Sequence, residues 1–373
     1  MSMKNVVEVK DLTVNFYTYA GVVEALDGVN VSLREGEILG LVGETGSGKS
    51  VTSLSVLMLV PPPGRIEGGS IYLDTTANEK DVLLMDDSAL RSMRGNDISM
   101  IFQEPRAYLN PVYTVEDQIG EVMVVHRKPE FLKNAVASLE KNNKGGSLEA
   151  RNYRRMLKAP RSLVTRFLQR FGSKKNLKSE VRKEVVKILK SVEIPDPERV
   201  ADMYPHELSG GMAQRVVIAM ALACNPKVLI ADEPTTNLDV TVQAQILNLV
   251  RLLKKNYNSS ILYITHDLGV VAQLCDRVAV MYAGSVVETG DVFEIFGGAL
   301  HPYTRALLES IPRPGKGFRS IPGIVPSLID PISGCRFRDR CSYAMEMCQK
   351  IKPPFVELKK DHFAACYLYG GSK

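Results

Sequence analysis

The sequence predicts an α/β fold in which buried strands alternate with helices around a glycine-rich loop. Three observations lead to this prediction. The apolar run EILGLV at 37–42 leads through a glycine-rich loop into the helical segment KSVTSLSVLMLV, which three prolines end. Strand and helix patterns alternate again from KVLIAD at 227–232 onward. Between residues 6 and 41, short apolar runs bounded by Gly and Asp predict an antiparallel sheet.

The remaining segments follow in order along the chain. Strand patterns return in 66–102, in GGSIYLD, DVLL and DISMIFQ, and helical periodicity dominates from 114 to about 201. After 232 we expect a helix over VTVQAQILNLVRLLKK, a strand over SILYIT, a helix near LGVVAQL and a strand over RVAVMYAG. The last 70 residues are rich in Pro and turns, and no internal repeat is present.

Composition and charge limit what the chain can be. A hydrophobic content of 45% and a charged content of 24% are ordinary for a globular protein. No stretch approaches 18 consecutive apolar residues and the first residues form no apolar signal core, so we expect any membrane work to depend on partner chains. The net charge of +5 is uneven, because 126–183 holds 17 basic and four acidic residues, a net of +13 against −8 elsewhere.

Residues 43–50, GETGSGKS, match G-x-x-x-x-G-K-[ST] between a buried strand and a helix. This context predicts a phosphate-binding loop, because glycines let backbone amides turn toward phosphates and the following helix presents unpaired N–H groups. Lys49 is expected to reach the β- and γ-phosphates of ATP, and Ser50 to bind Mg²⁺. The other expected contacts with the nucleotide in this segment are Gly43, Thr45, Gly46, Ser47, Gly48 and Val51.

An acidic pair follows the apolar run VLIA. We expect this strand to deliver Asp232 to Mg²⁺ and Glu233 to a position beside the γ-phosphate. Glu233 is the predicted general base, or the group that polarises the attacking water. An acidic pair at a strand end is by itself equally compatible with a solvated turn. Together with the phosphate-binding loop it indicates nucleotide hydrolysis.

A second anion site is predicted at LSGGM, where Ser209, Gly210 and Gly211 open the helical segment MAQRVVIAMALAC. One chain that binds one ATP has no need of two such sites. A dimer does need both, because the second site of one chain can cover the γ-phosphate held by the loop of its partner.

These motifs and their order resemble those of the ATPases of ABC transporters. LSGGM is similar to the signature motif of that family. The resemblance implies that Asp239, in PTTNLD, belongs to the loop that crosses the dimer seam. It also implies that Gln103, in IFQEP, senses Mg²⁺ or water, and that His266, in ITHD, is a catalytic contact to the γ-phosphate. Phe16 is the candidate aromatic that stacks on adenine, with Tyr17 as its rival.

Longer segments resemble the ATP-binding subunits of oligopeptide/dipeptide importers, among them IFQEPRAYLNP, YPHELSGGMAQRV, HPYTRALLESIP and the tail IPGIVPSLIDPISGCRFRDRC. The resemblance implies a nucleotide-binding domain over 1–297 and an importer-type C-terminal domain over 298–373. The helical subdomain is expected at about 104–225. Within it, about 127–178 exceeds what this branch normally has and forms a basic insertion.

Four of the six cysteines lie in the tail, with spacings of x5, x6 and x17: Cys335, Cys341, Cys348 and Cys366. The tight C-x₂₋₄-C pairs of zinc sites are missing, and wider spacing suits a cubane cluster better. Because several members of the branch bind a 4Fe-4S cluster through such a tail, the resemblance implies one here. Zinc, free thiols and disulfides remain alternatives. A structural role is expected and a redox-sensing role is the alternative. Cys224 and Cys275 are predicted core residues.

The resemblance as a whole implies an ATP-hydrolysing subunit that powers uptake of oligopeptides, dipeptides or a related solute such as an oligosaccharide or nickel. The implied cofactors are ATP, Mg²⁺ and the 4Fe-4S cluster. The implied partners are a second, related ABC ATPase in a heterodimer, two transmembrane permease subunits and an extracellular substrate-binding protein. The chain is expected at the cytoplasmic face of the cell membrane as a peripheral subunit that binds no nucleic acid.

Alternatives remain for the basic insertion and for the function. The insertion is interpreted as a solvated, partly disordered segment, a contact with an anionic membrane surface, or a nucleic-acid-binding segment. The rival function is a soluble ABC ATPase that acts on nucleic acid or ribosomes. Such proteins usually carry two nucleotide modules or long coiled-coil or zinc-hook insertions, which this sequence lacks. A non-hydrolysing regulatory subunit is disfavoured by the intact Lys49, Asp232, Glu233 and His266.

Overall fold

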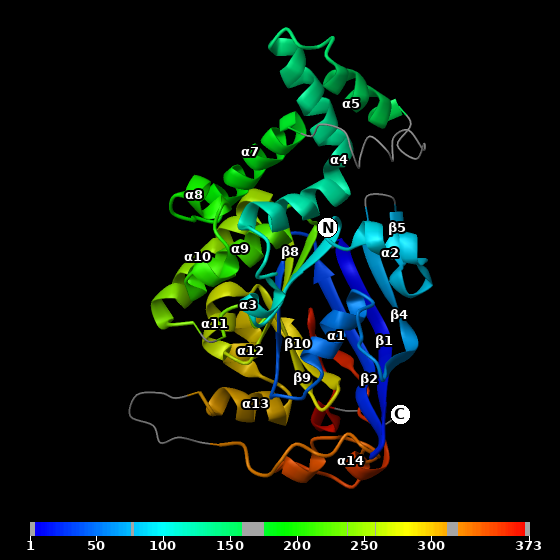
Figure 1. Cartoon of the computed structure of the whole chain (residues 1–373). Coiled ribbons are helices and arrows are strands. Elements are labelled where there is room, and N and C mark those ends of the chain that lie inside the picture. Colours follow the sequence, from blue (N-terminus) through cyan, green and yellow to red (C-terminus); the bar gives the residue numbers. More distant parts are fainter. Residues whose placement is uncertain are drawn as a thin grey trace. The chain divides into compact units, whose positions relative to one another are not determined.

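A mixed eight-stranded sheet carries the parallel strands of the structure (Figure 1). The computed structural model describes residues 4–75, 78–158, 175–236, 238–257, 259–311 and 320–369. The strand order is β11-β12-β10-β9-β3-β8-β7-β6. The bounds are β3 (Ile38–Val42), β6 (Ile98–Ile101), β7 (Val228–Asp232), β8 (Ser260–Thr265), β9 (Arg277–Tyr282), β10 (Ser285–Asp291), β11 (Val356–Lys359) and β12 (His362–Ala364). All residues of β3, β7, β8 and β9 are buried, as expected for central strands covered on both faces.

A second, antiparallel sheet has the order β2-β1-β4-β5. It consists of β1 (Asn5–Thr18), β2 (Gly21–Arg34), β4 (Gly64–Thr75) and β5 (Asn78–Asp81). Helix α1 (Lys49–Val56) packs against both β2 and β7, so the two sheets share one core. That core contains Val9 and Leu33 from the antiparallel sheet, Val56 from α1 and Ile230 from β7. The predicted α/β fold with an antiparallel sheet is therefore confirmed.

The chain divides into two units, and both sheets lie in the first. The first unit comprises Met1–Gln103, Lys227–Thr236 and Gln243–Lys373, and the second comprises Glu104–Pro226 and Asn237–Val242. Apart from α1, the helices of the first unit are α2 (Asp87–Met93), most of α10 (Val240–Tyr257), α11 (Leu268–Leu274), α12 (Val292–Gly298), α13 (Pro302–Glu309) and α14 (Met347–Lys350). The residues after 297 thus pack in the same unit as the phosphate-binding loop.

Two local predictions differ from the structure of the first unit, and one helix was not predicted. Helix α1 ends at Val56 rather than at the prolines 61–63. The expected strand DVLL is a 3-10 turn at Val82–Leu84, where Asp81 accepts a hydrogen bond from the backbone N–H of Leu83. Helix α2 follows, with Asp86 capping its first turn, and was not predicted because seven residues are too short to show periodicity.

The second unit is helical. Its described residues form α3 (Pro105–Tyr108), α4 (Val115–Lys141), α5 (Leu148–Lys158), α7 (Lys175–Ser191), α8 (Pro197–Ala201) and α9 (Gly210–Leu222). Phe131 and Leu139 of α4 and Tyr153 of α5 are buried, and Glu149 accepts a hydrogen bond from the side-chain amide of Asn176 at 2.8 Å. In its described part, the basic segment therefore forms helices whose apolar side chains are buried. Residues 159–174 of that segment lie outside the described residues. No helix in the described ranges is long and apolar enough to cross a membrane.

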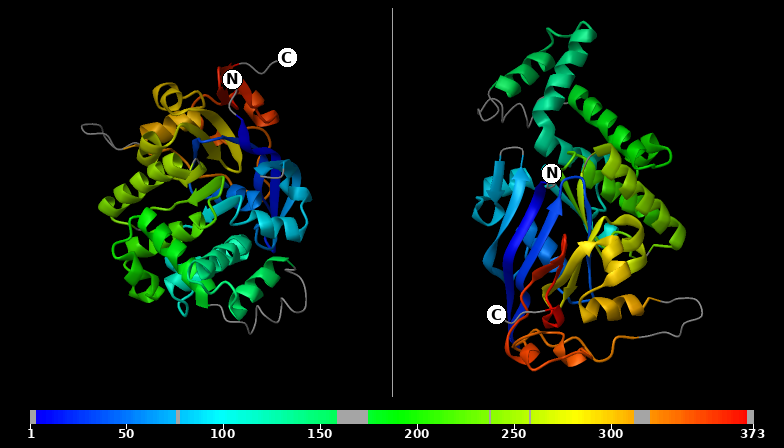
Figure 2. Two further views of the ribbon diagram at one scale, coloured as in Figure 1. Left: turned by 90° about the horizontal axis from the view of Figure 1, so that it is seen from above. Right: turned by 180° about the vertical axis from the view of Figure 1, so that it is seen from behind.

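The tail completes the large sheet. Strand β12 pairs with β10, with Glu288 opposite Ala364 and Thr289 opposite Phe363, and β11 adds the edge (Figure 2, where red β12 lies beside yellow β10). Glu288 is fully buried and accepts hydrogen bonds from the backbone N–H groups of Leu300 at 2.7 Å and His301 at 2.9 Å. Its Oε1 also lies 2.8 Å from Nε2 of His362. One carboxylate therefore joins β10, the start of α13 and the tail.

Replacement of Glu288 by Ala is predicted to lower the free energy of unfolding of the first unit by about 3 kcal/mol, because buried donors lose their acceptor. Glu294→Ala is the matched control. Its ion pair with Lys359 is about half exposed, so its loss should cost less than about 0.5 kcal/mol. Urea unfolding followed by circular dichroism measures both. Equal effects of the two substitutions would contradict the anchoring role of Glu288.

The effect of Glu288 should also depend on pH. Burial raises the pKa of Glu288, but the hydrogen bonds from His362, Leu300 and His301 outweigh it and hold the pKa below its ordinary value. A depressed folded pKa contributes stability above the unfolded value of about 4.3, and this contribution is lost as the pH falls through the folded pKa. The difference between wild type and Glu288→Ala should therefore narrow in acid.

Candidate functional site

The parallel register of three neighbouring strands brings the predicted motifs to one edge of the large sheet. Val42 of β3 lies opposite Thr265 of β8, and Asp232 of β7 lies opposite Ile264 of β8. The phosphate-binding loop, Glu233 and His266 follow the carboxyl ends of these three strands. Ligands of open α/β sheets bind at such an edge.

Lys49 and Asp232 are the buried charges of this edge, with 6% and 7% of their surfaces exposed. Lys49 Nζ donates to the carbonyl oxygens of Gly43 at 2.9 Å and Glu44 at 3.0 Å. Burial lowers the pKa of Lys49, while the nearby acidic side chains act against this shift. Burial likewise raises the pKa of Asp232, and a hydrogen bond with the Ser50 side chain opposes the shift. A cation, a hydroxyl and a carboxylate thus meet at the start of α1, a set that can bind phosphate and a divalent cation.

Glu233 stands at the centre of a second group. Its Oε2 accepts hydrogen bonds from Gln103 Nε2 at 3.2 Å and Thr236 Oγ1 at 3.0 Å, and its Oε1 lies 3.1 Å from His266 Nδ1. Burial raises the pKa of Glu233, but the hydrogen bonds with His266 and Thr236 and the charge of Lys49 leave it below its ordinary value. Glu233 is therefore a carboxylate that can accept a proton or orient a water molecule.

The backbone of Glu233 has a φ of 45°, in the left-handed region that residues other than glycine rarely adopt. Strain of this kind persists where the surroundings hold a residue in place, often at functional sites. Here the hydrogen bonds of Gln103, Thr236 and His266 fix the side chain of Glu233. Thr236 was not singled out from the sequence, although it lies in the segment PTTNLD that was.

The two candidate aromatic residues lie in different surroundings on β1. Phe16 is partly buried, and its ring packs near Gly64 and Val60. Tyr17 is 44% exposed, donates its hydroxyl proton to Glu67 at 2.8 Å and lies under the guanidinium of Arg65. An apolar ring that is free of such bonds suits stacking on a base better, which favours Phe16.

The signature segment, Ser209–Gly211, belongs to the second unit. Ser209 caps α9, because its Oγ accepts a hydrogen bond from the N–H of Met212 at 3.3 Å. A Cβ added to Gly210 would meet no atom within 4 Å, so this helix start is open to an approaching ligand. Asp239 accepts hydrogen bonds from the N–H groups of Thr241 and Val242, each at 3.0 Å, at the start of α10. Asn237 lies outside the described residues.

The four tail cysteines line one small cavity. The N–H of Cys335 donates to the carbonyl oxygen of Cys348 at 2.8 Å. Burial raises the pKa of the Cys335 thiol to about 11 and also raises those of Cys341 and Cys366. Among the described residues, however, no group of three or more His, Cys, Asp or Glu side chains is arranged to hold a metal ion. The structure therefore gathers the thiols without forming the predicted metal site.

The other two cysteines are buried, with 8% of Cys224 and 7% of Cys275 exposed. Burial raises the pKa of the Cys224 thiol to about 11. Both side chains therefore lie in the core, as predicted.

Comparisons with known proteins agree with this arrangement. Residues 26–236 match the family described as ABC transporter, and residues 287–348 match the oligopeptide/dipeptide transporter C-terminal region. The chain is 43% identical to the oligopeptide transport ATP-binding protein OppD of Bacillus subtilis, over 97% of this chain and 88% of that protein. It is 42% identical to the dipeptide transport ATP-binding protein DppD of the same organism, over 98% and 95%.

A solved structure shares the fold. The dimeric structure of MJ0796, a bacterial ABC transporter cassette, superimposes with a TM-score of 0.56 at 24% identity. The match covers 77% of this chain and 98% of that one.

Two glycines of the phosphate-binding loop provide a matched test of its geometry. A Cβ at Gly43, where φ is 155°, would collide with the carbonyl oxygen of Met281, whereas a Cβ at Gly46, where φ is 78°, would meet no atom within 4 Å. Gly43→Ala should therefore lower the free energy of unfolding by about 3 kcal/mol or more, and Gly46→Ala by about 1 kcal/mol. Thermal unfolding measures the difference, and equal midpoints for the two variants would show that the loop is not packed as described.

Proposed function

Because this chain belongs to the ABC transporter family, we infer that it is an ATPase that powers the import of oligopeptides or dipeptides. The main support for ATPase activity is that Lys49, Asp232 and Glu233 lie at the carboxyl edge of β3, β8 and β7. The match of residues 287–348 to the oligopeptide/dipeptide transporter C-terminal region supports the peptide class. The rival reading, an ATPase that acts on nucleic acid or ribosomes, has no such support.

Each residue at the sheet edge has a proposed role. Lys49 binds the β- and γ-phosphates of ATP, and backbone N–H groups of the loop surround them. Glu233 orients the attacking water and accepts its proton, while His266 and Gln103 hold the Glu233 carboxylate in place. Ser50, Asp232 and Gln103 would hold Mg²⁺, which offsets the negative charge of the phosphates when bound. Phe16 stacks on adenine.

The proposed active form is a dimer of ATPase subunits. In it, Ser209–Gly211 of one subunit close over the γ-phosphate held by Lys49 of the other, and Asp239 lies at the seam. The capped and open start of α9 supports this role, because a helix N-terminus favours an anion. We expect the second subunit to be a related ATPase. Two transmembrane permeases and an extracellular substrate-binding protein complete the importer, and the permeases attach the chain to the cytoplasmic face of the membrane.

We also propose that the tail binds a 4Fe-4S cluster through Cys335, Cys341, Cys348 and Cys366. The support is that these four side chains line a single cavity in the first unit. Cluster binding requires thiolates, so loading would release protons and would be favoured by higher pH. The cluster would stabilise a tail that has few regular elements of its own.

Glu233→Gln is predicted to bind ATP while its hydrolysis rate falls by at least about 100-fold, because the amide cannot accept the proton. ATP-loaded protein should accumulate as a closed dimer, alone or with its companion ATPase. Hydrolysis is measured with the purified chain, dimerisation by light scattering, and uptake with labelled peptides in cells that carry each variant.

The control for this prediction is Glu35→Gln, an exposed residue of the first unit, which should hydrolyse ATP at the wild-type rate. Wild-type turnover by Glu233→Gln would refute the assignment of the base. Loss of ATP hydrolysis without loss of peptide uptake would refute the proposal that this chain powers a peptide importer.

Chain purified without oxygen is predicted to contain four iron and four sulfide per molecule, and Cys341→Ser should lose both. Cys224→Ala and Cys275→Ala are the matched controls, since these buried cysteines lie outside the tail cavity and should leave the iron content unchanged. Iron and sulfide analysis and visible absorption report the cluster. The cluster proposal would be refuted if the wild-type chain contained zinc and no iron, or if it bound no metal after reconstitution.

A further inference from the structure

Arg340 of the tail makes a two-pronged ion pair with Glu44, which lies inside the phosphate-binding loop. Its Nη1 is 2.7 Å from Glu44 Oε2, and its Nη2 is 3.1 Å from Glu44 Oε1. Only 5% of the Arg340 side chain is exposed. Its Nε donates to the carbonyl oxygen of Pro322 at 2.8 Å, and Nη1 also reaches the Tyr282 hydroxyl at 3.2 Å. The guanidinium is therefore fixed in a single orientation.

Glu44 is held at its backbone as well. Its N–H donates to the Tyr303 hydroxyl at 3.0 Å, and its carbonyl oxygen accepts a hydrogen bond from Lys49 Nζ at 3.0 Å. Arg340 thus pairs with the side chain of a residue whose backbone is hydrogen-bonded to the phosphate-binding Lys49. A change at the Glu44 carboxylate would therefore affect Lys49 through the backbone of Glu44 itself.

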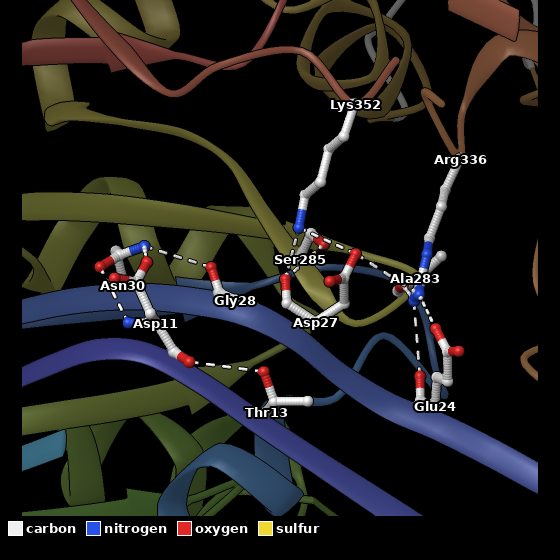
Figure 3. A network of polar contacts seen from close by, with 10 residues as sticks. All are labelled: Asp11, Thr13, Glu24, Asp27, Gly28, Asn30, Ala283, Ser285, Arg336 and Lys352. Carbon is white, nitrogen blue, oxygen red and sulfur yellow. Dashed lines mark hydrogen bonds and ion pairs between the residues drawn. The ribbon is translucent and has the colours of Figure 1, made fainter. Parts of the chain in front are cut away.

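A second arginine anchors the same part of the tail (Figure 3). Arg336 donates to the carbonyl oxygen of Ala283 at 2.6 Å and to Glu24 Oε2 at 2.8 Å. The next residue, Gly284, donates its N–H to the carbonyl oxygen of Ser47 at 3.0 Å. Lys352 adds a bond to the carbonyl oxygen of Asp27 at 2.6 Å. These contacts keep the segment that carries Arg340 against the loop independently of Arg340 itself.

A carboxylate in a phosphate-binding loop is electrostatically unfavourable, because it repels the triphosphate and competes for Lys49. The charge of Glu44 is one of those that interact with Lys49. We propose that Arg340 is a positioning residue for ATP binding, which cancels the charge of Glu44 in the phosphate-binding loop. The inference rests on ATP binding by this family and not on a metal in the tail.

The test separates an effect of the Arg340 charge on ATP binding from a merely structural role of Arg340 in attaching the tail. Arg340→Gln should raise the KM for ATP about tenfold and leave kcat within about twofold, because one uncompensated charge acts on substrate binding. The increase should shrink at high salt. Arg340→Lys keeps the positive charge but loses the two-pronged geometry of the guanidinium, and should recover most of the affinity for ATP. Lys350→Gln removes an exposed tail charge that pairs with Glu346, the residue before α14, and should leave KM unchanged.

The double variant Arg340→Gln with Glu44→Gln should return the KM to within about twofold of wild type, since neither charge then remains. Glu44→Gln alone leaves Arg340 uncompensated and should lower the KM severalfold, a result that does not depend on the folding of Arg340 variants. Steady-state hydrolysis and titration with a fluorescent ATP analogue measure these values. An unchanged KM in Glu44→Gln, or a double variant as impaired as Arg340→Gln, would overturn the proposal.

Discussion

The register of three parallel strands governs the functional end of this molecule. Because β3, β8 and β7 run side by side in the same direction, the loops after them must emerge at one edge. These strands are entirely buried, so they are rigid supports for the few polar groups that follow them. The antiparallel sheet, α1 and the surrounding helices cover the strands and thereby allow such a register. A slip of one residue would move Glu233 away from His266 and Gln103.

The tail is a structural part of the nucleotide-binding unit. It supplies β11 and β12 to the large sheet, and several of its side chains meet glutamates of the preceding chain, among them His362 at Glu288 and Arg340 at Glu44. Both contacts are largely removed from water, where a hydrogen-bonded charge has a much larger effect than on the surface. The sheet and the phosphate-binding loop are therefore complete only when the tail is in place.

The sequence predicted much of the fold and most of the residues that the structure brings together at the candidate site, and the omissions have a common cause. Lys49, Asp232, Glu233 and His266 each follow an apolar run, so a local pattern reveals both the strand and the polar group at its end. Arg340 has no such pattern, because its partner is 296 positions away. Strands β11 and β12 are four and three residues long, too short to show alternation among prolines. In the basic segment, the charge count concealed the buried Phe131 and Tyr153, which form a helical core.

The long separation between Glu44 and Arg340 has a consequence for the newly made protein. A ribosome that adds about 5–20 residues per second would produce the arginine on the order of half a minute after the glutamate. Throughout that interval the emerging polypeptide carries a phosphate-binding loop whose acidic side chain lacks its counter-ion. Prematurely terminated products that lack the arginine would share this defect, so synthesis of the tail would affect how tightly a new molecule binds ATP.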